Sequence, residues 1–118
     1  MNYGGKINAD MQKCIDACME SYSCCEQTIT HCLKQGGRYV DMAMMGPLMD
    51  CADVTRACAD MVMRQSPMAV EMAGMCARVA EMCADACMTM NSDQMMKRCA
   101  GVCKSCSDAC RAMAGVRA

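Results

Sequence analysis

The clearest fold signal in the chain is the stretch Cys99-Ala-Gly-Val-Cys103-Lys-Ser-Cys106-Ser-Asp-Ala-Cys110. A helix turns about 100° per residue, so steps of four, three and four residues keep these four cysteines within about 40° of one line. Charged side chains such as Asp108 fall away from that line. The stretch therefore predicts an amphipathic helix whose apolar face is made of thiols.

The same angular test places thirteen of the fourteen cysteines on four narrow stripes, one in each of four segments of the chain. Within each segment the members stay within about 40° of one line. Only Cys24 departs, by about 80°. The stripe cysteines are Cys14, Cys18, Cys25, Cys32, Cys51, Cys58, Cys76, Cys83, Cys87, Cys99, Cys103, Cys106 and Cys110.

Turn and capping residues divide the chain into four helices. Gly36-Gly37 ends the first helix, and Ser66-Pro67 and Asn91-Ser92-Asp93 begin the third and fourth. Gly46-Pro47 predicts a break in the second. Short connections force neighbouring helices antiparallel. We expect an all-α fold, an antiparallel up-down four-helix bundle with a cysteine-lined core, forming a single domain over residues 1–118. The predicted helices span about residues 8–35, 38–64, 67–90 and 93–114.

The composition puts sulfur where aliphatic side chains usually form the core. The chain has 14 Cys and 18 Met but no Phe or Trp. Its seven Val, three Ile and two Leu are too few to fill an ordinary interior. Cys and Met pack as apolar side chains, and both are soft ligands that select Cu(I) and similar metals. The sulfur interior is therefore expected both to pack and to bind metal.

Charge and hydropathy argue against two kinds of partner. The net charge is −1 and no basic stripe is present, so nucleic-acid binding is not expected. The sequence lacks the roughly 18 consecutive apolar residues that a bilayer span requires, so membrane insertion is not expected. The polar start of the sequence predicts a cytoplasmic protein. A periplasmic location is the alternative if an export signal has been removed.

Two structural explanations of the cysteines compete with metal binding. Thiols could pack a tight core as alanines do, but they bury less area than leucines and so cost stability unless the sulfur is used. A disulfide scaffold is the second explanation. Such scaffolds are usually short, secreted and rich in loops. Cysteines four residues apart on one helix also point the same way, which suits a disulfide poorly. Bridges between helices remain open.

The spacing favours Cu(I) over other metals. Zinc and iron–sulfur sites use four ligands, commonly in short paired motifs, whereas steps of four and seven residues dominate here. Side chains four apart on a helix have Cβ atoms about 5–6 Å apart, which matches two metal–sulfur bonds of roughly 2.3 Å in line. One monovalent ion per thiolate would neutralise the column. We expect on the order of one Cu(I) per stripe cysteine, with bridging sulfurs.

Methionines gather where the thiol column would open. Met44 lies within about 20°, and Met90 and Met95 within about 40°, of their cysteine lines. An antiparallel bundle brings all three to the end where the first helix stops, beside His31. Thioethers there would form a weak Cu(I) port. Further candidate ligands are therefore Cys24, Met44, Met90, Met95 and His31.

Three motifs resemble the bacterial copper storage proteins. They are Cys14-Ile-Asp-Ala-Cys18, the run from Met75-Cys76 to Cys83-Ala-Asp-Ala-Cys87, and Cys99 to Cys110, and the resemblance extends from about Met11 to Met113. It implies a homotetramer of four-helix bundles, each holding many Cu(I) ions, with a role in copper storage and homeostasis. The abundance of Met and the single His depart from cytosolic relatives.

The predicted function is high-capacity Cu(I) binding and storage by thiolates inside the bundle. An enzyme is not expected, because a single His offers no set of nucleophile, base and orienting residue. The alternatives are a low-capacity copper chaperone, a disulfide or thiol-redox protein, and a structural cysteine-rich helical protein.

Overall fold

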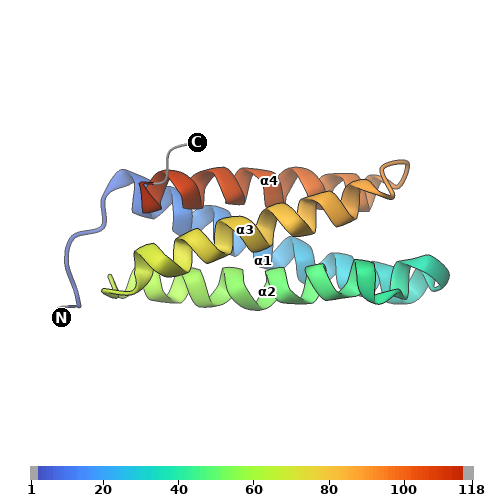
Figure 1. Cartoon of the computed structure of the whole chain (residues 1–118), viewed down its shortest axis with the longest axis horizontal. Coiled ribbons are helices and arrows are strands. Elements are labelled where there is room, and N and C mark those ends of the chain that lie inside the picture. Colours follow the sequence, from blue (N-terminus) through green and yellow to red (C-terminus); the bar gives the residue numbers. More distant parts are fainter. Residues whose placement is uncertain (1–2, 116–118) are drawn as a thin grey trace.

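Four α-helices form the protein in a computed structural model that describes residues 3–115 (Figure 1). A short 3-10 turn, η1, lies between the first two helices, and no strand occurs within residues 3–115. The predicted all-α, four-helix class is confirmed. The elements are α1 (Ala9–Gln35), η1 (Gly37–Val40), α2 (Met42–Met63), α3 (Ala69–Met88) and α4 (Gln94–Ala114).

Each helix runs antiparallel to the next, and the bundle is about twice as long as it is wide, 47 × 24 × 18 Å (Figure 1). Helix α1 packs against α2 and α4, and α3 packs against the same two helices. We call one end of the bundle the terminal end: it holds the start of α1, the end of α4 and the α2–α3 turn. The opposite end, with the α1–α2 and α3–α4 connections, is the loop end (Figure 1).

Caps fix the ends of α1 and the start of α4 close to the predicted positions. Asn8 Oδ1 accepts a hydrogen bond from the N–H of Met11 at 2.8 Å, which satisfies one free donor of the first turn. Gly36 ends α1 at φ 71°, a value that glycine adopts without strain. At α4, Asp93 Oδ1 accepts from the N–H of Met95 at 2.8 Å.

Two boundaries differ from the sequence prediction. Ser66 caps a turn rather than the helix, because its Oγ accepts from the N–H of Met68 at 3.1 Å and α3 begins only at Ala69. The chain also breaks at Asp41, before α2, while α2 continues through Gly46-Pro47. Proline removes the hydrogen bond that its own N–H would donate one turn back, and its ring crowds the carbonyl there. Near the start of a helix that loss does not end it.

The amphipathic pattern orients the helices as the sequence requires. The cysteine stripes face inward, and charged side chains such as Lys104 and Asp108 face solvent, where they pair at 3.0 Å. Within residues 3–115, every buried side-chain nitrogen or oxygen has a hydrogen-bond partner. Among the described helices, none has an apolar stretch of the length that crossing a membrane takes.

Candidate metal centre

Thiols from all four helices line the interior of the bundle. All fourteen cysteines are buried, and all are free thiols. Thirteen are completely inaccessible to solvent, and Cys24 is 2% exposed. Because the four stripes converge on one axis, the bundle encloses a column of sulfur.

The column starts near the terminal end with six thiols, which we call the terminal group. The Sγ atom of Cys18 lies 3.5 Å from that of Cys110 and 3.8 Å from that of Cys76. It also lies 3.8 Å from the Sγ atom of Cys106. These contacts join α1, α3 and α4, and Cys58 adds a thiol from α2. The terminal group comprises Cys14, Cys18, Cys58, Cys76, Cys106 and Cys110.

Eight further thiols form a second group toward the loop end, the loop group. Cys103 is its centre, with its Sγ atom 3.6 Å from that of Cys25 and 3.7 Å from that of Cys83. It lies 3.9 Å from the Sγ atoms of both Cys51 and Cys99. The loop group comprises Cys24, Cys25, Cys32, Cys51, Cys83, Cys87, Cys99 and Cys103.

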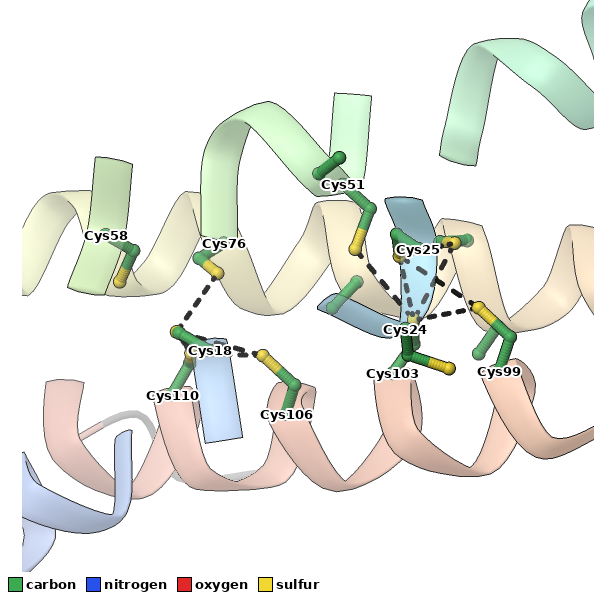
Figure 2. Packing of buried hydrophobic residues seen from close by; sticks show 14 of the residues in the cluster. Cys18, Cys24, Cys25, Cys51, Cys58, Cys76, Cys99, Cys103, Cys106 and Cys110 are labelled. Atoms are coloured by element: carbon green, nitrogen blue, oxygen red, sulfur yellow. Dashed lines mark hydrogen bonds between the residues drawn. The ribbon is translucent and has the colours of Figure 1, made fainter. Parts of the chain in front are cut away.

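The two groups are separated by a layer, here called the dividing layer, in which three of the four helices have no cysteine. Figure 2 shows the labelled thiols gathered in two places along the axis, with dashed contacts inside each group. Within residues 3–115, no hydrogen-bonding contact between sulfurs joins one group to the other. In the layer, the stripe positions of α1, α2 and α3 hold Ser21, Thr55 and Ala80, all fully buried. Among the four described helices, only α4 has cysteines at successive stripe positions across the layer, Cys103 and Cys106.

The hydroxyls of this layer are occupied by hydrogen bonds. Ser21 Oγ lies 3.4 Å from Cys103 Sγ and 3.6 Å from Cys51 Sγ. Thr55 Oγ1 donates to the carbonyl oxygen of Cys51 at 2.6 Å. Both hydroxyls of the layer are therefore buried without an unsatisfied hydrogen bond.

Within each group the thiols form overlapping sets, each with all its Sγ atoms within 4.8 Å of one another. Cys18 and Cys110 belong to both sets of the terminal group, and Cys83 belongs to both sets of the loop group. A shared sulfur can bridge two ions. Metal–sulfur bonds of roughly 2.3 Å span such separations, and thiolates select soft metals. The four sets are Cys14, Cys18, Cys58 and Cys110; Cys18, Cys76, Cys106 and Cys110; Cys25, Cys51, Cys83 and Cys103; and Cys83, Cys87 and Cys99.

Thiol pairing and burial shift the pKa values inside the column. Pairing with Cys106 and burial both raise the pKa of Cys18. Pairing with Cys110 lowers the pKa of Cys58, because a neighbouring S–H stabilises the thiolate. Burial raises the pKa of Cys32. Most thiols therefore stay protonated until a metal replaces the proton, so acid opposes loading.

Buried methionines close the loop end, and outside them lies a hydrogen-bonded group of three polar side chains, which we call the latch. Met44 is 4% exposed and Met96 is fully buried, with its Sδ 3.8 Å from Cys32 Sγ. Outside them, His31 Nε2 lies 2.8 Å from Asp93 Oδ2, and the hydroxyl of Tyr39 donates to the same oxygen at 2.8 Å. The latch formed by His31, Tyr39 and Asp93 joins α1, η1 and the start of α4.

The predicted candidates occupy distinct places in this arrangement. Every stripe cysteine except Cys32 belongs to one of the four sets. Cys24 adjoins Cys99, and that pairing together with burial raises the pKa of Cys24. Met90 and Met95 are partly buried at the loop end. The ring of His31 is held by Asp93 rather than by the column.

Several features of the site escaped the sequence analysis. The dividing layer was missed, although Ser21 follows Cys14 by seven residues and so continues its stripe. Met96, whose Sδ lies 3.8 Å from Cys32 Sγ, lies about 60° from the line of Cys99 and was not among the candidate ligands. The latch joins segments far apart in the sequence, and no local pattern signals it.

A four-helix bundle with overlapping sets of buried thiols defines a helical protein built to bind several soft metal ions at once. The sequence matches the model of the copper storage protein family over residues 7–115, and the chain belongs to that family. Copper storage is thus the function of the chain. No curated protein matches the sequence significantly.

Solved structures share the fold over nearly the whole chain. A protein from Nitrosospira multiformis is 29% identical, with a TM-score of 0.83, covering 92% of this chain and 97% of its own. The Cu(I)-bound copper storage protein BsCsp3 is 26% identical, with a TM-score of 0.83 and coverages of 89% and 98%. The copper storage protein of Streptomyces lividans, loaded with 10 copper equivalents, is 25% identical, with a TM-score of 0.84 and coverages of 98% and 95%.

Proposed function

We propose that the protein stores Cu(I) as two thiolate-bridged clusters, one in the terminal group and one in the loop group. The thirteen stripe cysteines are the ligands. The observation that supports this most directly is the sharing of Cys18, Cys110 and Cys83 between sets of thiols. A protein with one isolated tetrahedral site would need no shared sulfurs.

Charge balance favours a monovalent ion. Many buried thiolates would repel one another strongly in a core of low polarity. One Cu(I) per thiolate cancels that charge. One divalent ion per thiolate would instead leave a net positive charge in the core. Relatives with Cu(I) or with ten copper equivalents bound share the fold. The capacity is on the order of one Cu(I) per stripe cysteine.

The remaining candidate ligands act at the margin of the loop group. Cys24 adds a thiol beside Cys99. Met44, Met90 and Met95 offer thioethers at the loop end, where they bind Cu(I) weakly and pass it inward. His31 joins them when it leaves Asp93.

Three further properties belong to the proposal. The protein is not an enzyme, because its single His is held by Asp93 at the end of the bundle. It resides in the cytoplasm, where reducing conditions keep fourteen thiols free. It assembles as a homotetramer, which would cover exposed apolar side chains such as Met82. Sedimentation equilibrium of the full chain tests the assembly.

Anaerobic titration of the reduced protein with Cu(I) tests the storage function. We expect saturation at roughly one ion per stripe cysteine, with about one proton released per thiol. Saturation at one or two equivalents would instead identify a chaperone, and no binding would leave a structural or redox role.

Adjacent cysteines provide a matched control for the ligand assignment. Cys25 belongs to a four-sulfur set, whereas Cys24 belongs to none. Cys25→Ser should therefore lower the copper affinity of the loop group more than Cys24→Ser does. Equal losses would contradict the assignment of the stripe as the ligand set.

A further inference from the structure

The dividing layer separates the terminal group from Cu(I) ions that enter at the loop end. A Cu(I) ion that enters at the loop end meets the loop group first. To go further it must pass the layer of Ser21, Thr55 and Ala80, where, among the described helices, only α4 has cysteines at successive stripe positions. The terminal group would fill more directly from its own end of the bundle.

Thioethers cover that end. Met11, Met72 and Met113 come from three different helices, and each lies three or four residues from the outermost cysteine of its helix. All three are partly exposed and pack against the buried core. The remaining helix, α2, contributes Val62, which is fully buried. We call Met11, Met72 and Met113 the terminal thioethers.

Met72 also lines a groove that opens on the surface. The groove has a volume of about 190 Å³, and its other lining residues are Met61, Met68, Glu71 and Met75. Four thioethers thus surround one surface groove, and one of them also packs against the core. The groove offers sulfur ligands to a soft cation, and Met72 lies about one helical turn from Cys76 in the sequence.

The N-terminal segment does not seal this end. Residues 3–8 leave the start of α1 and cross toward the α2–α3 turn (Figure 1). One hydrogen bond, from the N–H of Gly4 to the carbonyl oxygen of Arg64 at 3.2 Å, connects the segment to that turn. Every residue of the segment is exposed.

We propose that the terminal thioethers form a Cu(I) transfer site that loads the terminal group from the terminal end, independently of the loop end. The inference rests on the proposed storage function. Thioethers bind Cu(I) without losing a proton, so the ion exchanges readily. At Cys76 and its neighbours, each thiol that takes up the ion releases its proton to solvent.

Stopped-flow uptake of Cu(I) from a coloured chelate, with the full reduced chain, tests the site. The test variant is the triple change Met11→Leu, Met72→Leu and Met113→Leu, since leucine nearly preserves the volume of methionine. The control is the matched triple change Met44→Leu, Met90→Leu and Met95→Leu at the loop end. The final copper content of each variant shows whether its interior is intact.

The terminal triple should slow part of the uptake by on the order of tenfold, equivalent to about 1.4 kcal/mol of lost stabilisation, at unchanged final content. That slowed phase should be absent when Cys18, Cys76, Cys106 and Cys110 are all serine. In addition, the ε-methyl NMR signals of the terminal thioethers should shift with the first fraction of an equivalent of Cu(I).

Two results would overturn the proposal in distinguishable ways. If the terminal triple loads at the wild-type rate and to the wild-type content, the transfer site is wrong while the storage function stands. If the parent protein binds no more than one or two ions, the storage function fails and the transfer site fails with it.

Discussion

The two halves of the column share one interior design but close differently. Both use inward thiols from four helices, with Sγ separations of 3.5–4.0 Å. At the loop end, Met44 and Met96 are buried beneath the latch. At the terminal end, the terminal thioethers are partly exposed and no comparable polar network covers them within residues 3–115. We therefore expect the stripe pattern to set how much metal each half holds, and the closing residues to set how easily the metal enters.

Removing four thiols from one half of the column should reduce copper binding more than any other change. Cys25, Cys51, Cys83 and Cys103 changed together to Ser should lower the capacity by about four Cu(I), roughly one per lost ligand, while the terminal group still fills. Anaerobic titration against a chromophoric chelator measures the loss.

The equivalent change in the other half is the control. Cys18, Cys76, Cys106 and Cys110 changed together to Ser should lower the capacity by a similar amount. The two losses should add, because within residues 3–115 no hydrogen-bonding contact between sulfurs joins the groups. A single quartet that abolished all binding would contradict the division into two clusters.

Removing the latch should have the next largest effect. Asp93 caps α4 and accepts hydrogen bonds from His31 and Tyr39. Asp93→Ala should lower the free energy of unfolding by about 1–2 kcal/mol through the lost cap. Urea unfolding measures this. Asp108→Ala, which breaks an exposed pair with Lys104, should cost no more than about 0.5 kcal/mol.

The pH dependence of the free energy of unfolding tests whether the Asp93 carboxylate provides this stabilisation. The hydrogen bond from His31, together with that from Tyr39, lowers the pKa of Asp93 from 3.8 to about 2, against the effect of burial. A lowered folded-state pKa stabilises the fold above pH 3.8 and loses that effect as the pH falls toward 2. The difference between the wild type and Asp93→Ala should therefore shrink over that range. An equal difference at pH 6 and pH 2 would exclude the carboxylate as its source.

Adding one thiol should change the copper capacity least. Its position relative to the dividing layer should decide whether it speeds the filling of the terminal group. Thr55 and Thr28 are both buried, and each donates to the carbonyl four residues earlier, at 2.6 and 2.7 Å. Thr55→Cys places sulfur in the dividing layer, whereas Thr28→Cys places it inside the loop half. Each should add about one Cu(I). Only Thr55→Cys should restore fast filling of the terminal group in the terminal triple variant, measured by stopped-flow. Equal behaviour of the two variants would show that the layer does not separate the groups.

Much of the fold and of the thiol interior could be predicted from the sequence, because both follow from one local period. Steps of three, four and seven residues fix a helix face, and Asn8, Gly36 and Asp93 mark helix ends by local capping. These signals depend on near neighbours, so they survive without knowledge of the tertiary structure. The effect of Pro47 was misjudged because its cost depends on its distance from the start of the helix.

The parts that could not be predicted depend on several segments at once. Ser21 and Thr55 are polar, so from sequence alone they look like interruptions of the stripe rather than members of it. Their shared level along the axis emerges only when α1 and α2 are packed. The latch brings together His31, Tyr39 and Asp93 through the geometry of two connections, which no spacing rule encodes.

The close approach of free thiols has a consequence for the protein in an oxidising environment. Cys18 Sγ and Cys110 Sγ lie 3.5 Å apart on different helices, so a modest local movement would join them as a disulfide, whose bond length is about 2.05 Å. Each such bond withdraws two ligands at once. Exposure to oxidants would therefore lower the metal capacity in steps of two thiols, and a cargo that occupies those sulfurs would protect them.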